Sequence, residues 1–102
     1  MAIYADVEKY SAEENLLWQQ LTLLQGETFH TARGLEFTYR ISGNEMFISR
    51  KKKSITRSTV NMAYRKAAEL KVVSGPKKLQ TFGASYLYPV LLRLKICSSI
   101  RN

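Results

Sequence analysis

The sequence predicts a single α+β domain in which a small antiparallel sheet of about three strands packs with three helices. Three observations lead to this prediction: apolar residues recur at helical spacing in three segments, residues 34–41 alternate strictly, and the chain has 102 residues. That length fits one domain, since domains cluster at roughly 100–150 residues. The expected order is α-β-β-β-α-(β)-α, and such mixing is typical of the α+β class. Residues 98–102 are expected to fray.

The first expected helix covers residues 12–24. Ser11 and Glu14 have the spacing of a capping box, in which the two side chains satisfy the first free backbone amides of a helix. Leucines then recur near helical spacing, with Trp18 among them as a core anchor. Gly26 is a plausible end signal, because glycine tolerates the left-handed conformation that often follows a helix.

Strand patterns follow this helix. In residues 35–41, Leu, Phe, Tyr and Ile alternate with Glu, Thr and Arg, which is the period of a half-buried strand. Ser42-Gly43-Asn44 is a turn signal, and apolar residues resume at Met46. We therefore predict a central β-hairpin over residues 34–49, preceded by a shorter strand at about 27–31.

The second half of the chain predicts two more helices. One should run from about 55 to 70, with Ser54 or Thr56 as its cap, because alanine-rich sequence with Arg and Lys favours helix. The other should run over about 85–95, with Pro89 near its first turn, where a missing N–H costs least. Between them, Val72-Val73 is expected to be extended, and residues 79–82 form either a short strand or extended chain.

Several classes of protein are disfavoured by composition. His30 and Cys97 are the only residues of their kinds, so neither an internal disulfide nor Cys/His metal spacing is expected. Cys97 lies near an apolar helix end, where a buried, unreactive thiol is the default. The longest apolar stretch, residues 86–92, is far shorter than the about 20 residues of a membrane span. We expect a cytoplasmic protein with no cofactor, no metal and no membrane partner.

Charge is the most informative property of this sequence. The formal net charge is +8, and it is unevenly distributed. Residues 1–45 hold three basic and seven acidic residues, whereas residues 46–102 hold thirteen basic residues and one acid, Glu69. Such asymmetry favours a polyanionic partner. The leading hypothesis is a small basic nucleic-acid-binding protein, with gene regulation as one such role, that uses the basic region 50–78.

Candidate binding residues lie in this region because lysine and arginine neutralise phosphates and small polar side chains reach phosphates and base edges. A carboxamide such as that of Asn61 can pair bidentately with adenine. The predicted nucleic-acid-binding residues are Arg50, Lys51, Lys52, Lys53, Arg57, Ser58, Thr59, Asn61, Arg65, Lys66, Lys77 and Lys78. Tyr86 and Tyr88 could stack on bases, but we favour a core role for both.

Residues 53–70 contain the run Thr56-Arg57-Ser58-Thr59-Val60. This segment resembles the recognition helix of helix-turn-helix transcription factors. The resemblance implies that Arg57, Ser58, Thr59 and Asn61 face DNA. The alternative interpretation of the same residues is an amphipathic core helix with a solvated basic face.

Two other classes of function stay open. The first is a non-enzymatic interaction protein or inhibitor that acts on a nucleic-acid-containing enzyme complex, similar in size and in its lack of catalytic motifs to phage and mobile-element accessory proteins such as anti-CRISPR proteins. The second is a metal-independent ribonuclease toxin that uses Arg, Lys and Tyr. We expect no catalytic residues and no enzyme activity. A homodimer formed through the first helix is left open.

Overall fold

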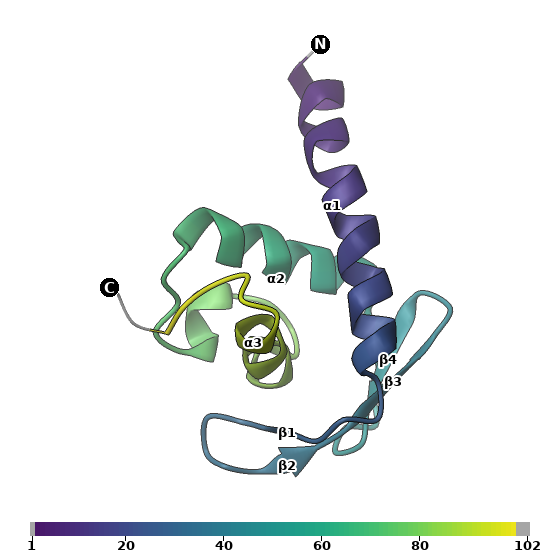
Figure 1. Ribbon diagram of the computed structural model, residues 1–102, viewed down its shortest axis with the longest axis vertical. Coiled ribbons are helices and arrows are strands. Elements are labelled where there is room, and N and C mark those ends of the chain that lie inside the picture. Colours follow the sequence, from purple (N-terminus) through teal and green to yellow (C-terminus); the bar gives the residue numbers. More distant parts are fainter. Residues whose placement is uncertain (1, 100–102) are drawn as a thin grey trace.

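The computed structural model describes the backbone of residues 2–99 and the side chains of residues 12–99. Figure 1 shows the arrangement of the elements. They are, in chain order, α1 (Ala2–Leu24), β1 (Phe29–His30), β2 (Glu36–Phe37), β3 (Tyr39–Ser42), β4 (Glu45–Ile48), β5 (Ile55–Thr56), α2 (Arg57–Leu70), the 3₁₀ helix η1 (Pro76–Leu79) and α3 (Ala84–Arg93). The predicted α+β class and the order of its elements are confirmed.

The strands form two small antiparallel ladders rather than one. β3, β4 and β5 make a three-stranded sheet, with Tyr39 opposite Ile48 and Met46 opposite Ile55. β1 pairs with β2 in a separate ladder. The predicted hairpin 34–49 is therefore interrupted at Thr38, whose N–H donates to the Ser49 hydroxyl at 3.0 Å. The third strand of the larger sheet is β5, and the predicted strand 27–31 belongs to the smaller ladder.

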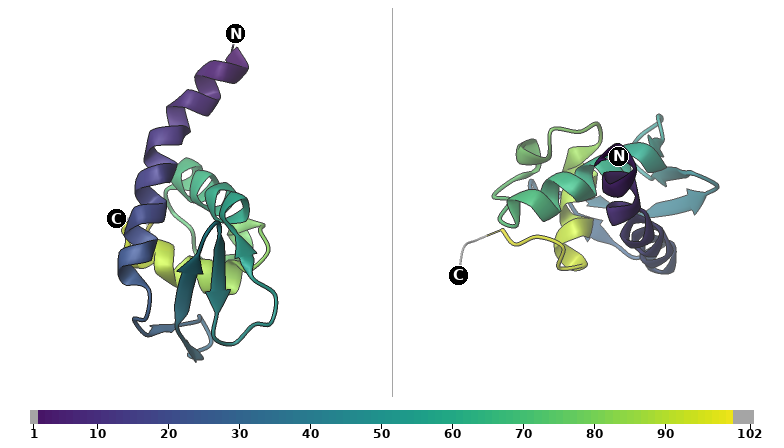
Figure 2. Two further views of the ribbon diagram at one scale, coloured as in Figure 1. Left: turned by 90° about the vertical axis from the view of Figure 1, so that its right-hand side faces the viewer. Right: turned by 90° about the horizontal axis from the view of Figure 1, so that it is seen from above.

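The core lies between this sheet and the helices, and the two views of Figure 2 show how the sheet and the helices are arranged. Its fully buried side chains come from every part of the fold, and they include Leu17, Leu21, Met46, Ile55, Val60, Leu79, Leu87 and Leu91. Aromatic rings of the strands contribute to this core: Phe29 stacks on Phe37 and on Tyr39, with ring centroids 5.9 and 5.8 Å apart. Trp18 is buried, as expected, and donates from Nε1 to the Gly43 carbonyl at 3.3 Å.

The first helix is longer than predicted. α1 begins at Ala2 and continues through Ser11, and its first half stands away from the rest of the molecule in Figure 1. The predicted capping box is therefore wrong, because Ser11 is an interior residue of the helix and Glu14 is buried against α2. No proline or glycine interrupts residues 2–10, so nothing in that segment opposes continuation of the helix. The helix ends as predicted, before Gly26 at φ +88°.

Three smaller differences concern the C-terminal part. α3 begins one residue earlier than predicted and ends at Arg93, so Pro89 lies in its second turn. The carbonyl of Ser85 thus receives no amide from Pro89, and Ser85 is exposed, so solvent can satisfy it. Residues 79–82 form no strand, because Leu79 ends η1 and Gln80 is left-handed at φ 55°.

The predicted fraying from residue 98 is wrong at Ser98 itself. Its backbone bridges to Val72 in parallel, through hydrogen bonds from Ser98 N to Lys71 O and from Val73 N to Ser98 O. Cys97, just before it, is buried as predicted, and burial raises the pKa of its thiol. Of the rest of the predicted frayed tail, residue 99 is described as a bend and residues 100–102 lie outside the described residues. Within the described part of the chain, no helix is long and apolar enough to cross a membrane.

Tyr39 makes folding sensitive to alkaline pH. Its hydroxyl is buried and donates to the Leu21 carbonyl at 2.6 Å. Burial and then the nearby Glu27 carboxylate raise the pKa of Tyr39 above its ordinary value of about 10. Between these two values the unfolded chain releases the phenol proton and the folded protein keeps it, so stability falls as pH rises through this range.

We therefore expect the Tyr39→Phe variant to be less stable than the wild type at neutral pH, and this difference in stability to become smaller at high pH. At pH 8 the variant should be about 1–2 kcal/mol less stable than the wild type, because the Leu21 carbonyl loses its donor. The difference should shrink at pH 11, because only the wild type carries the Tyr39 penalty. Urea unfolding of both proteins at the two pH values measures it. A difference that is the same at pH 8 and pH 11 would contradict the expectation.

Candidate nucleic-acid interface

The N-terminus of α2 is formed as predicted. Thr56 is its N-cap, and the Thr56 side chain accepts from the backbone N–H of Thr59. Ser58 is exposed, whereas the Thr59 hydroxyl lies 3.0 Å from that of Thr56. Arg57 donates to the side-chain carbonyls of Asn15 and Asn44 at 2.8 and 3.3 Å. Its guanidinium also lies 5.2 Å from the centre of the Trp18 ring, so Arg57 joins α1 and the β3–β4 turn to α2.

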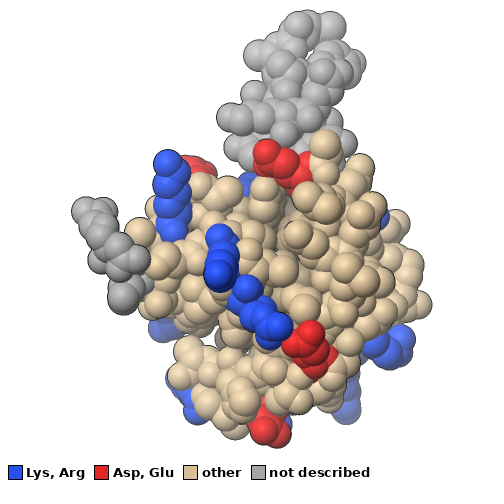
Figure 3. Space-filling view, viewed as in Figure 1, with Lys and Arg blue, Asp and Glu red and all other residues tan. Residues whose placement is uncertain are grey.

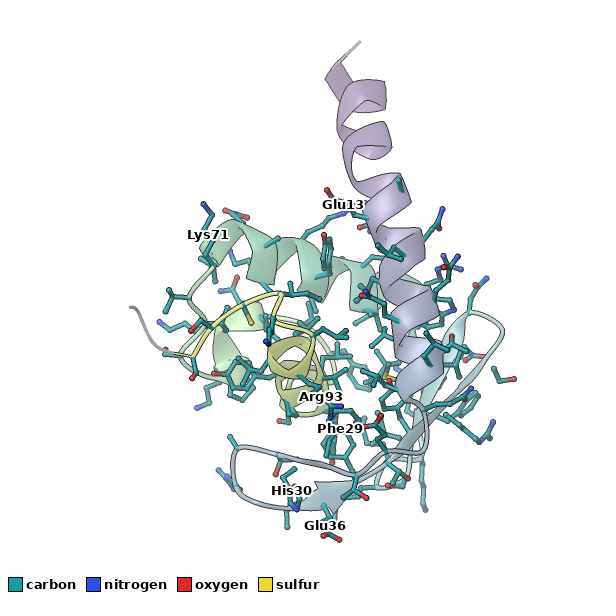
Figure 4. All side chains as sticks on the ribbon, viewed as in Figure 1. Glu13, Phe29, His30, Glu36, Lys71 and Arg93 are labelled. Carbon is teal, nitrogen blue, oxygen red and sulfur yellow. The ribbon has the colours of Figure 1, made fainter. Side chains whose placement is uncertain are left out.

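Arg65 is likewise engaged with α1. Its guanidinium binds the Glu14 carboxylate bidentately, through Nε at 2.6 Å and Nη2 at 3.0 Å. The Glu14 side chain is only 8% exposed, while that of Arg65 is 46% exposed. One residue earlier on α2, the Tyr64 hydroxyl donates to Glu13 at 2.8 Å, and Figure 4 shows Glu13 on α1 where that helix faces α2. Two of the predicted phosphate contacts thus hold helices together.

This packing also limits the helix-turn-helix resemblance. The element directly before α2 is β5, and α1 is separated from α2 in the chain by all five strands. A helix-turn-helix requires a helix joined to the recognition helix by a short turn. The likeness therefore covers the sequence of α2 and does not extend to the arrangement around it.

A polar cavity of about 730 Å³ lies where α1, the β3–β4 turn and the start of α2 meet. The carboxylates of Glu14 and Glu45 line it beside Arg57 and Asn61. The Asn61 Oδ1 atom is buried and has no hydrogen-bond partner within the described residues. Because two carboxylates share this cavity with the arginine, its electrostatics are mixed and do not favour a phosphate.

The basic loop after β4 is placed differently. Arg50 donates from Nη1 to the Glu36 carbonyl at 3.3 Å. The ammonium groups of Lys51 and Lys53 lie 4.4 and 5.1 Å from the centre of the Phe82 ring. Lys52 and Lys53 are exposed, and Lys51 is half-buried. The loop therefore presents a cluster of ammonium groups around one aromatic side chain.

Gly83 brings Phe82 to this loop. Gly83 has φ +75° and packs so closely on Ile55 that a Cβ atom in its place would overlap the Ile55 side chain. Ile55 is fully buried in β5, immediately after the basic loop. The residues next to Phe82 and next to the basic loop are thus in close contact in the core.

The remaining predicted lysines lie on two different elements. Lys77 and Lys78 are exposed on η1. Lys77 lines a groove of about 640 Å³ that continues to Thr81, the neighbour of Phe82, and to Tyr86. Lys66 is half-buried on α2, away from that groove's lining residues. The structure therefore associates the loop 50–53 with η1 through residues 81–86, and leaves Lys66 apart from them.

Arginines and lysines are used differently among the described side chains. The ion pairs of Arg or Lys within residues 12–99 join Arg65 to Glu14 and Arg93 to Glu27. Over the same residues, no lysine has a carboxylate oxygen within 4.0 Å. In the view of Figure 3, blue side chains lie at separate places over and around the face, with red side chains beside several of them. Within residues 12–99, therefore, none of the lysines is ion-paired, whereas two of the arginines are.

Sequence reasoning missed Phe82 and Arg33. Phe82 is 43% exposed, and the prediction for residues 79–82, a short strand or extended chain, gave it no role in binding. Arg33 lines the same groove as Lys77, but it lies outside the basic region 50–78 to which the predicted binding residues were confined. Of the two tyrosines considered for stacking, Tyr88 is buried and donates to the Val73 carbonyl at 2.6 Å. Burial, and then Cys97, raise the pKa of Tyr88.

No family model, no curated protein and no solved structure matches this chain. Assignment of a role therefore depends on the residues and their geometry. Within the described residues there is also no group of three or more His, Cys, Asp or Glu side chains placed to hold a metal ion.

Proposed function

We propose that the protein binds nucleic acid through a lysine surface made of Lys51, Lys52, Lys53, Lys77 and Lys78. The observation that supports it is the absence of carboxylate partners for these ammonium groups within residues 12–99, in a chain of net charge +8. Unpaired surface lysines repel one another, and when they neutralise phosphates they release the counterions condensed on the nucleic acid, which favours binding. Arg57 and Arg65 have a structural role in this proposal, because each donates two hydrogen bonds to side chains of α1 or of the β3–β4 turn.

The groove beside the lysine surface supports the same proposal. Its lining contains Arg33 and Lys77 and no carboxylate, whereas the cavity at the start of α2 contains two. A phosphate is therefore better accommodated by the groove between η1, α3 and the β1–β2 turn. This places the proposed site on a different surface from the one that the helix-turn-helix resemblance implies.

Fluorescence anisotropy with labelled single-stranded RNA, single-stranded DNA and duplex DNA, each at two salt concentrations, tests the proposal. We expect Lys51→Gln/Lys53→Gln to weaken binding by at least roughly 10-fold, because charge-assisted contacts are lost. The slope of log affinity against log salt should fall by about one for each phosphate contact removed. Binding by the wild type should weaken steeply as salt rises.

Lys71→Gln/Lys95→Gln is the matched control. It removes the same charge from residues that line a different cavity, and Figure 4 shows Lys71 at the C-terminal end of α2. α2 alone separates that end from β5 by roughly 20 Å at 1.5 Å per residue. Equal losses in the two variants would show a non-specific charge effect and overturn the proposed surface. Absence of any binding at low salt would overturn direct binding altogether and favour a protein complex as the partner.

A further inference from the structure

Phe82 is an aromatic side chain held at the surface in the middle of positive charge. It is 43% exposed. Lys51 Nζ lies 4.4 Å from the centre of its ring and Lys53 Nζ lies 5.1 Å from it. Lys51 Nζ is also 5.9 Å from the centre of the Tyr86 ring, so the two rings and the loop lysines are neighbours.

The groove described above begins beside this ring. Thr81 precedes Phe82 in the chain and lines the groove, and Tyr86 lines it as well. The Thr81 Oγ1 atom is buried without a hydrogen-bond partner within the described residues. The other polar side chains of the lining are those of Thr31, Arg33, Lys77, Gln80 and Ser85. At about 640 Å³ the groove falls within the range of sites for small molecules, roughly 300–1,000 Å³.

We propose that the ligand of this surface is a single strand of nucleic acid, with one unpaired base stacked on Phe82. The phosphates on either side of that base contact Lys51 and Lys53, and the next nucleotide enters the groove lined by Arg33 and Lys77. This inference rests on the proposed function and adds the strandedness of the ligand to it. RNA and DNA share the chemistry that is recognised here, and the binding experiment distinguishes them.

The unoccupied ring is partly covered by the loop lysines, and binding requires an exchange. An exposed ammonium on an aromatic ring contributes less than a charge-assisted hydrogen bond to phosphate. The lysine stems are flexible, so the ammonium groups can move from the ring to the phosphates while the base takes their place. The hydrated ammonium groups thus cover part of the exposed ring when no strand is bound.

A duplex is a poorer ligand for this arrangement. The faces of a paired base are covered by its neighbours in the helix, so Phe82 cannot stack without unpairing it. Aromatic stacking together with a basic groove is the combination by which single strands are bound without sequence preference. The surface should therefore prefer single strands and should tolerate many sequences.

Three substitutions of Phe82 test this inference. Phe82→Ala and Phe82→Leu should each reduce affinity for single strands roughly 10-fold and leave both duplex affinity and the salt slope unchanged. Leucine keeps an apolar side chain but removes the ring, so its loss reports stacking rather than burial. Phe82→Trp should retain affinity, and its added tryptophan fluorescence should be quenched when an unlabelled single strand binds, whereas the buried Trp18 changes little.

Met62→Ala is the matched control, because Met62 is also an exposed apolar side chain, at 59%, but lies on α2. It should bind single strands as the wild type does. Wild-type affinity in both Phe82→Ala and Phe82→Leu, with salt-dependent binding intact, would overturn the stacking site and leave the proposed function standing. A wild-type preference for duplex DNA would also overturn it. Failure of the wild type to bind any of the three nucleic acids would overturn both.

Discussion

Replacing Arg65 with alanine is expected to destabilise the protein by about 3 kcal/mol, because it leaves the Glu14 carboxylate buried without its partner. The Glu14 side chain is 8% exposed and receives both guanidinium hydrogen bonds of the pair. At so buried a carboxylate, solvent compensates only in part for the two guanidinium hydrogen bonds that are lost. α1 and α2 are joined at this point, so unfolding should remain a single transition with a lower midpoint.

The opposite substitution should cost much less. Glu14→Ala leaves a guanidinium that is 46% exposed, which solvent can hydrate, so we expect a loss of about 1 kcal/mol. The double variant should be more stable than Arg65→Ala alone, since it no longer buries an unpaired charge. Urea unfolding of the two single variants and the double variant gives the coupling energy by a double-mutant cycle.

Arg93→Ala is the control for an exposed pair. Arg93 binds Glu27 at 3.0 Å, but both side chains are about half exposed, and such pairs contribute about 0–1 kcal/mol. Equal losses in Arg65→Ala and Arg93→Ala would show that burial of Glu14 does not govern the effect. The comparison also matters for binding experiments, because reduced nucleic-acid binding by an Arg65 variant does not by itself separate lost stability from a lost phosphate contact.

Local sequence patterns predicted the elements of this chain well where a pattern is compatible with only one kind of structure. The alternation in residues 35–41 predicted strands, and Phe37 and Tyr39 are buried as it implies. Thr56 was one of two candidate caps and is the cap of α2. The spacing between Ser11 and Glu14 misled because a capping box and an interior turn of helix look alike locally. Only the position of Arg65, 51 residues away in the chain, determines that Glu14 is buried in an ion pair.

The sequence predicted that the candidate site carries positive charge, but it did not predict where on the folded protein that site lies. Counting residues located the positive charge after residue 46, but it could not separate arginines that bind α1 from lysines that have no carboxylate partner. Arg57 and Arg65 were predicted to contact phosphate, and the structure shows both in contact with side chains brought close by the packing of α1 on α2. Phe82 was overlooked because its exposure depends on the tertiary contact between Gly83 and Ile55.

The contact between Gly83 and Ile55 therefore links stability to the proposed site, and Gly83→Ala should show both. The new alanine must adopt φ +75°, and its Cβ atom must displace the Ile55 side chain, which is fully buried. The backbone strain costs on the order of 1 kcal/mol, and overpacking a core costs about 1–3 kcal/mol. We expect a combined loss of about 3 kcal/mol in urea unfolding. A shifted Phe82 should also bind single strands less tightly at temperatures where the variant is folded.

Gly34→Ala separates the two causes of this loss. Gly34 has φ +86°, and no atom lies within 4 Å of the position of an added Cβ, so its substitution carries the backbone strain alone and should cost on the order of 1 kcal/mol. The strain at Gly34 should not be smaller than that at Gly83, because its φ is further from the left-handed value of about +57°. If Gly83→Ala is no more destabilising than Gly34→Ala, then Ile55 yields easily and the close approach does not hold Phe82 in place. If it is clearly more destabilising and also weakens binding to single strands, the buried contact behind Phe82 determines where the exposed ring stands among the lysines.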